Sequence, residues 1–298
     1  MDRIRRAGGL AAAACAVIAV HLAERFETIR GSRRVMMMRI YRLFRTFFHA
    51  CLAEEFEYRA NFLANIAMTL FTLGMSVLTV LLFFYRSSSL GGWSFYEVLA
   101  LLGIFNALHG FIELFLQPNM SRLVSHIRQG TLDFVLLKPV DSQFFVSFRH
   151  LVLWRFADIG LGLALTGYAV WRLDGPPAWH ELIMFVLLFG AALVIIYSLW
   201  TGMMVMSFWA VKVDNLSFLF HSIFETSRYP ASVYSGALRL VLLYVLPIGL
   251  VTTVPAEAIV GRLDSLHAIG AMLLAALFLL GARLLWKQAL RAYTSASS

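Results

Sequence analysis

The stretch NFLANIAMTLFTLGMSVLTVLLFFY, residues 61–85, decides the fold. It contains no charged side chain, and it is longer than the ~20 apolar residues that an α-helix needs to cross a bilayer. The whole chain has 298 residues, of which 60% are hydrophobic and 14% are charged, and its mean hydropathy is +0.76. Because a soluble domain carries about 25% charged residues, this composition excludes a compact soluble enzyme, a disordered chain and a disulfide scaffold. The sequence predicts an integral membrane protein.

Five further apolar stretches reach or approach the length of a membrane span. They cover residues 95–116, 151–171, 182–209, 238–254 and 266–286. We therefore expect an all-α integral membrane protein with six transmembrane helices. Its expected parts are an N-terminal extension (1–35), an amphipathic interface helix (36–60) and a six-span transmembrane domain (61–298).

The basic residues are distributed very unevenly along this chain. Of its 25 lysines and arginines, 22 lie in residues 1–60, 117–155 and 210–239 and in the tail from 281. The three alternate loops between the apolar stretches hold only three. Because positive residues remain on the side from which a membrane protein is inserted, we expect both termini in the cytoplasm, which requires an even number of spans.

The first 35 residues allow more than one interpretation. MDRIRR followed by AGGLAAAACAVIAV at 7–20 has the charged start and short apolar run of a secretory signal peptide. Cleavage would leave seven arginines on the translocated side, against the charge rule. We therefore favour a surface-lying extension, or a gene start annotated ahead of Met36.

The next segment, residues 38–59, has the pattern of an amphipathic helix. Apolar residues such as Ile40, Phe44 and Phe47 recur at steps of three and four, while Arg42 and Arg45 occupy much of the other side. This pattern predicts a helix lying in the cytoplasmic membrane interface, with its arginines toward anionic headgroups. A soluble helix packed on a partner is the alternative.

The loop between the second and third apolar stretches also predicts an amphipathic helix. Pro118 suits a first helical position and Gly130 the position just past a helix end. Pro139 then prevents a helix from continuing through Lys138. The expected apolar stripe consists of Met120, Leu123, Val124 and Ile127. From composition alone this loop could equally be an ordinary connector.

The run RQGTLDFVLLKPVD at 128–141 resembles the signature of the ABC-2 type permeases, the membrane subunits of ATP-driven exporters. Weaker resemblances are FW at 208–209, ETSRYP at 225–230, VPAEAIVG at 254–261 and WKQALRAYTSASS from 286. The resemblance covers the chain from about residue 37 to its end. It implies a permease that forms the translocation route of an exporter while a separate ATPase supplies the energy.

The same resemblance identifies the loop helix as the coupling helix that docks on the ATPase, with its apolar face in an ATPase groove. The expected coupling residues are Met120, Leu123, Val124, Ile127, Arg128, Gly130, Asp133, Lys138, Pro139 and Asp141. The implied complex has two ATPase subunits and a second permease copy or related permease. The first and fifth spans are the expected seam between permeases, and the implied location is the bacterial inner membrane.

The sequence also predicts what this chain does not do. A P-loop ends in LysSer or LysThr, but Lys138, Lys212 and Lys287 are followed by Pro, Val and Gln. We therefore expect ATP and Mg to be bound by the partner ATPase. In this chain we expect no catalytic, cofactor-binding or metal-binding residues and no enzymatic activity. A membrane-embedded enzyme would need convergent polar groups, and an ATP-independent channel or scaffold is the alternative function.

Three charged residues stand out within or beside the predicted spans: Glu113, Arg155 and Asp158. Because a charge at the bilayer centre costs about 2.5–3.5 kcal/mol, each needs a partner. Arg155 and Asp158 are three residues apart and can pair on one helix face. Glu113 lies four residues after His109 and has no assigned partner, so we expect a role at a subunit interface or along a pathway. The sequence does not identify the transported substrate.

Overall fold

The computed structural model describes residues 42, 44, 45, 47, 48, 52, 59–138, 141–209 and 214–293, and contacts divide the chain into Met1–Ala50 and Cys51–Ser298. The predicted extension, 1–35, lies outside the described residues. Within the predicted interface helix, the described residues are helical, with Arg42 and Arg45 exposed and Phe44 half-buried. Its location at a membrane surface stays a prediction.

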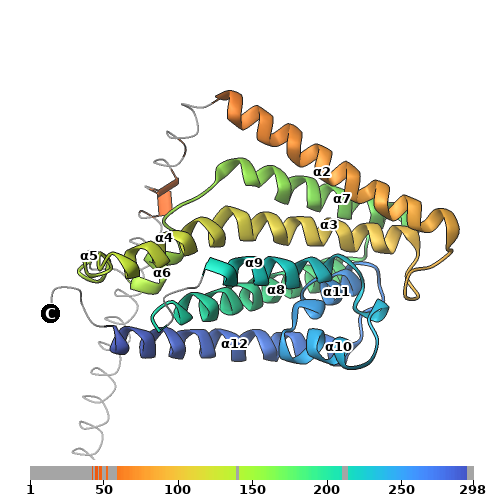
Figure 1. Cartoon of the computed structure of the whole chain (residues 1–298). Helices are drawn as coiled ribbons and strands as arrows, with labels where there is room; N and C mark the ends of the chain where they lie inside the picture. Colours follow the sequence, from red (N-terminus) through yellow and green to blue (C-terminus); the bar gives the residue numbers. More distant parts are fainter. Residues whose placement is uncertain are drawn as a thin grey trace, which may run out of the picture. The chain divides into compact units, whose positions relative to one another are not determined.

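The second unit is built from helices, as the composition predicted. The longer ones are α2 (Arg59–Arg86), α3 (Phe95–Phe111), α4 (Gln117–Arg128), α7 (Phe156–Asp174), α8 (Trp179–Met206), α9 (Asp214–Glu225), α11 (Ile248–Ile259) and α12 (Ser265–Ala292). The shorter ones are η1 (Ile112–Leu116), α5 (Asp133–Leu136), α6 (Ser142–Phe148), η2 (Leu153–Arg155), η3 (Thr226–Arg228), η4 (Ala231–Val233), α10 (Gly236–Leu240) and η5 (Val241–Val245). Figure 1 shows α4, α5 and α6 at one end of this bundle and the loop between α2 and α3 at the other.

Four helices are long and apolar enough to cross a membrane. They are Phe62–Arg86, Phe95–Arg128, Trp179–Met206 and Ser265–Ala292. Two bent pairs, Ser142–Phe148 with Leu153–Leu173 and Gly236–Leu243 with Ile248–Ile259, raise the number to six if each pair counts as one span. The chain is thus a multi-pass membrane protein.

The sequence analysis expected the second span to end at residue 116, just before Pro118. The helix instead continues past both residues. It runs from Phe95 to Arg128, and η1 in its middle is a turn of π-helix. Proline cannot donate a hydrogen bond to the carbonyl four residues earlier, and its ring crowds that carbonyl. Here that carbonyl belongs to Leu114, and it accepts the N–H of Val152 at 3.2 Å. The helix therefore continues past the proline.

The closest packing between helices joins α3 to α7, and it depends on glycine. A Cβ atom on Gly103 would lie 2.5 Å from the carbonyl oxygen of Gly162, and one on Gly162 would lie 2.6 Å from the backbone nitrogen of Ala107. Thr166 uses this closeness, because its hydroxyl donates to the carbonyl of Ala100 across the two helices at 3.2 Å. Bulkier residues at these positions would force the helices apart.

Helix α9 runs along α3 and α4 in the opposite direction. Near the start of α9, Ser217 Oγ contacts Met120 Sδ at 3.6 Å, and further along Phe224 stacks on Phe105 with ring centroids 5.1 Å apart. The chain then reaches the far end of the bundle, where Ser232 Oγ donates to the carbonyl of Gly91 at 2.7 Å. Residues 214–232 therefore connect the two ends of the bundle, although the sequence analysis placed them in a loop at one end.

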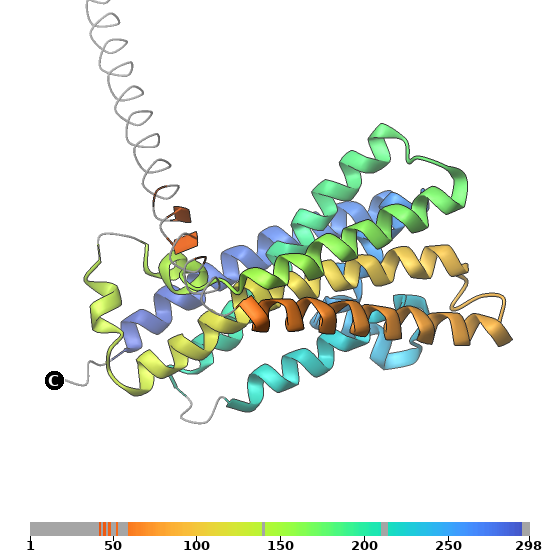
Figure 2. The ribbon, with the colours of Figure 1, turned by 90° about the horizontal axis from the view of Figure 1, so that it is seen from above.

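The predicted fifth span, 238–254, is instead part of a helical hairpin. It begins after Ser232, beside Gly91, and it ends where Arg262 donates to the carbonyl of Gly92 at 3.2 Å. Both ends of the hairpin thus touch one short loop, so the hairpin enters and leaves at the same end, and Figure 2 shows its light-blue helices near that end. Pro247 lies in the turn before α11, where its missing N–H interrupts the helix.

Candidate functional site

A cluster of charged and polar side chains lies where α3 passes into η1. Arg155, just before α7, donates from Nη1 to Asp158 Oδ2 at 2.9 Å and from Nη2 to Glu113 Oε2 at 3.1 Å. The first contact confirms the pairing predicted from their spacing. The second supplies the partner that the sequence analysis could not assign to Glu113. One guanidinium therefore pairs with two carboxylates and ties the helix formed by α3 and η1 to the start of α7.

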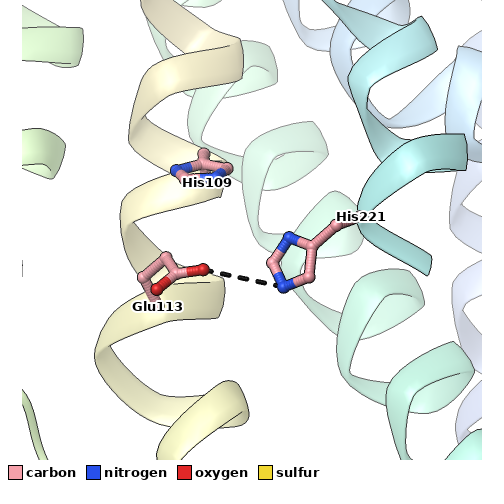
Figure 3. A group of neighbouring side chains, drawn as sticks. All are labelled: His109, Glu113 and His221. Atoms are coloured by element: carbon pink, nitrogen blue, oxygen red, sulfur yellow. Dashed lines mark ion pairs between the residues drawn. The ribbon is translucent and has the colours of Figure 1, made fainter. Parts of the chain in front are cut away.

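The second oxygen of Glu113 faces α9. Glu113 Oε1 lies 3.6 Å from His221 Nε2, and Figure 3 shows the two side chains pointing toward each other from separate helices. His109 stands one turn before Glu113, and its ring centroid lies 6.1 Å from that of His221. One ligand atom from each of these three residues lies within 4.8 Å of the others, so the three could hold a metal ion.

Aromatic side chains surround this cluster and limit its contact with water. The ring of Trp200 from α8 lies edge-on to His221, at 5.6 Å between centroids, and Phe105 and Phe224 lie 6.0 and 6.4 Å from His109. Trp200 is fully buried and Phe105 is 2% exposed. Electrostatic attraction is stronger in such surroundings than in water. The ion pairs here consequently count for more than surface ion pairs.

The apolar stripe of α4 is largely buried within the chain. Met120, Leu123 and Val124 are 2%, 1% and 8% exposed, and Ile127 is half-buried. Because α4 continues α3, this stripe extends the buried face of the bundle and packs against the chain itself. The amphipathic helix is present as predicted. Docking of its apolar face in a groove of the ATPase stays a prediction, and three of the four stripe residues offer little exposed surface for it.

The exposed apolar residues of this region follow α4 instead of lying on it. Gly130 ends α4 with φ of +67°, a conformation that favours glycine, at the position predicted from the sequence. The chain then enters α5, where Phe134 is 69% exposed, and Leu137 directly after α5 is 81% exposed. Arg128 at the end of α4 is also exposed. This tip, residues 128–138, carries the exposed apolar side chains of the predicted coupling segment.

Asp141 fixes the return of the chain toward α7. Its carboxylate accepts the N–H of Phe144 at 3.0 Å and so caps α6, and it forms an ion pair with Arg283 of α12. Burial acts to raise the pKa of Asp141, but the hydrogen bonds from Arg283 and Phe144 outweigh it and hold this pKa below its usual value. Asp141 thereby joins the coupling segment to the last helix.

Lys138 and Asp133 complete the described part of this segment. Lys138 Nζ lies 4.1 Å from the ring centroid of Phe145, and burial, together with Arg149, lowers the pKa of Lys138. Asp133 is half-buried in the first turn of α5. Pro139 lies outside the described residues.

Two residues of this region were missed by the sequence analysis. Asn119 is 2% exposed, and its amide group donates to the carbonyl of His150 at 2.7 Å and accepts the N–H of His150 at 3.0 Å. His221 reaches the cluster from α9 and lies 108 residues after Glu113 in the sequence. A buried asparagine beside a proline is a local signal that could have been noticed, whereas the place of His221 depends on the path of α9.

A known protein family matches most of this chain. The profile described as ABC-2 family transporter protein matches residues 70–297, which include the polar cluster, α4 and the hairpin. No curated protein matches the chain significantly. Because the profile covers well over half of the chain, this protein belongs to the family of ABC-2 transporter proteins.

Proposed function

We propose that this chain is the permease subunit of an ATP-binding-cassette exporter in the bacterial inner membrane. It forms the translocation route, and a separate ATPase binds ATP and Mg and supplies the energy. Family membership supports the proposal, and so does the exposed apolar tip at residues 128–138, where Phe134 and Leu137 stand in solvent. Exposed apolar patches mark interaction sites.

The surface beside the tip is hollowed, which suits this region to contact with a second protein. An open depression of about 420 Å³ lies beside it, between α4 and α9. Its lining residues are Met120, Ser121, Val124, Ser125, Arg128, Gln129 and Ser217. In this proposal Phe134, Leu136 and Leu137 provide the apolar contact with the ATPase, and the buried stripe of α4 connects that contact to α3.

The proposed topology has six passes and both termini in the cytoplasm. The passes are α2, α3 continued by η1 and α4, α7, α8, α9 with η3, and α12, while the α10–α11 hairpin enters from the outside and returns there. This arrangement moves Arg239 outward, because α10 follows Ser232 and Gly91. It also places Arg228 at the outer end of the pass made by α9 and η3. That leaves 20 of the 25 basic residues on the cytoplasmic side, two fewer than before, and the charge rule still gives the same orientation.

The proposed assembly contains two permeases and two ATPase subunits. Two ATPases that act together need two docking tips, and one copy of this chain has one tip. The second permease is a copy of this chain or a related one. An ATP-independent channel or scaffold would need no such partner, so co-purification in mild detergent separates the two functions.

The experiment combines co-purification with a charged double substitution, Phe134→Asp with Leu137→Asp. We expect membrane abundance to persist, while ATPase co-purification and transport-coupled ATP hydrolysis fall to background. The reason is that an unpaired charge in a buried contact costs several kcal/mol. The matched control, Phe134→Leu with Leu137→Met, should retain both. If the charged variant still co-purifies with the ATPase, the tip is not the ATPase contact. If the wild-type chain is active without an ATPase, the protein is an ATP-independent channel and not a permease subunit.

A further inference from the structure

A candidate metal site is formed by His109, Glu113 and His221, and no metal-binding sequence motif contains these residues. Two ligands come from successive turns of one continuous helix, and the third comes from α9, as Figure 3 shows. Two imidazoles and one carboxylate are the protein ligands of one class of zinc site, in which the fourth position is left to a water or another donor. Imidazole ligands also favour zinc, copper, nickel and cobalt over magnesium and calcium.

A fourth polar side chain, Gln117, lies beside these residues. Its amide group faces His221 Nε2 and the carboxylate of Glu113, which lie 3.6 Å from each other. Turning the amide over would let its nitrogen donate to His221 Nε2 at 2.9 Å. The amide can thus turn its nitrogen toward the cluster when the site is empty and its oxygen toward it when a cation is bound.

The net charge of the side chains around the cluster is compatible with a divalent cation. Arg155 lies 3.1 Å from Glu113 Oε2, but its charge is also shared with Asp158 at 2.9 Å. The two carboxylates and one guanidinium sum to one negative charge, which a divalent ion would change to one positive charge. Arg155 contacts only the Oε2 atom, so Oε1, which faces His221 and Gln117, can serve as a ligand. Such an outer hydrogen bond orients a ligating carboxylate.

We propose that His109, Glu113 and His221 bind one divalent transition-metal ion, with zinc as the best match. Zinc–nitrogen bonds of 2.0–2.1 Å place neighbouring ligand atoms roughly 3.4 Å apart in a tetrahedron. The ligand atoms now lie within 4.8 Å of one another, so side-chain rotation and a small approach of α9 to α3 complete the site. The bound ion would join α3 to α9 immediately before α4. This site stands independently of the proposed permease function.

The test is metal binding by the full-length chain, purified in detergent through a tag without histidines. Zinc is titrated in competition with a chromogenic chelator, and cobalt is added separately to record its visible absorption. We expect one zinc per chain in the wild type and a tetrahedral or five-coordinate cobalt spectrum. In His109→Ala and His221→Ala we expect zinc affinity to fall by more than the about 10- to 100-fold that outer-shell changes cost. Glu113→Gln should also weaken binding.

The matched control is His180→Ala, because His180 is exposed at the start of α8, far along the chain from this cluster. It should bind zinc like the wild type. Each variant is also checked for single-peak elution and for its melting temperature without metal, and His221→Gln replaces any variant that fails this check. Zinc should raise the melting temperature of the wild type but not that of the ligand variants. Absence of one-to-one binding, or equal binding by His109→Ala and His221→Ala, would overturn the proposal.

Discussion

Helices α2 and α3 are both long and apolar enough to cross a membrane, yet their surroundings differ sharply. In the most apolar 18-residue stretch, 11% of the residues of α2 are buried, against 72% in the span that begins with α3. Gly74 of α2 has nothing within 4 Å of its added Cβ, whereas Gly103 of α3 meets the backbone of α7. Hydropathy thus indicates that a helix avoids water, but not whether it contacts lipid, a second chain or its own fold.

The largest expected effect tests this contrast through glycine. In Gly103→Leu, the new side chain would press on the carbonyl of Gly162, and backbone cannot yield as a side-chain tip can. We expect folded protein to be lost, as measured by monodisperse elution in detergent. Gly74→Leu on α2 is the matched control and should elute normally. Equal behaviour of the two variants would show that α3 and α7 do not pack as closely as described.

A smaller effect is expected from removing the charge that ties α3 to α7. Arg155→Ala leaves Glu113 and Asp158 together without a cation. Breaking a fully buried ion pair costs about 3–5 kcal/mol, and the cost is lower here because Arg155 is 23% exposed. We expect a fall of several degrees in melting temperature, and no such fall for Arg86→Ala at the exposed end of α2.

A charge-neutral triple variant sharpens this second prediction. Arg155→Gln combined with Glu113→Gln and Asp158→Asn keeps hydrogen-bonding groups but removes all three charges. It should recover part of the stability that Arg155→Ala loses, because no carboxylate then lacks a cation. If the triple variant melts below Arg155→Ala, the loss comes from packing of the arginine stem and not from unpaired charge.

The smallest effect concerns the bare surface of α2, which is expected to contact a second permease. Phe71 and Leu78 of α2 are 59% and 45% exposed. With Cys15 and Cys51 changed to serine, a single cysteine at either position should form cross-linked dimers in membranes under mild oxidation, detected by gel electrophoresis. A cysteine at Leu102, which is fully buried in α3, should not. Failure at every exposed α2 position would assign this surface to lipid.

Much of the fold follows from the sequence because local signals determine it. Apolar length located α2, α8 and α12 to within a few residues, Gly130 marked the end of α4, and the three-residue spacing paired Arg155 with Asp158. Each of these depends on neighbours in the sequence. Local signals of this kind are the most reliable part of reading a sequence.

The candidate site was less predictable because it depends on contacts between distant segments. The fifth apolar stretch is long enough to span a membrane, and only the contacts of Ser232 and Arg262 with one loop reveal a hairpin. The α4 stripe is amphipathic, but periodicity cannot tell whether its apolar face meets another protein or the chain itself. His221 joins Glu113 because α9 runs back along α3, a path that no local pattern encodes.

The π-helical turn at Ile112–Leu116 acts as a phase shift within one continuous helix. A π-turn holds one residue more than an α-turn, and one residue corresponds to about 100° of rotation. Without the π-turn, the side chains after Leu116 would be rotated about the helix axis relative to His109. Met120 would then turn away from Ser217, and Asn119 would turn away from His150. A single extra residue therefore sets the angular alignment between the membrane-embedded half of this helix and the half that extends toward residues 128–138.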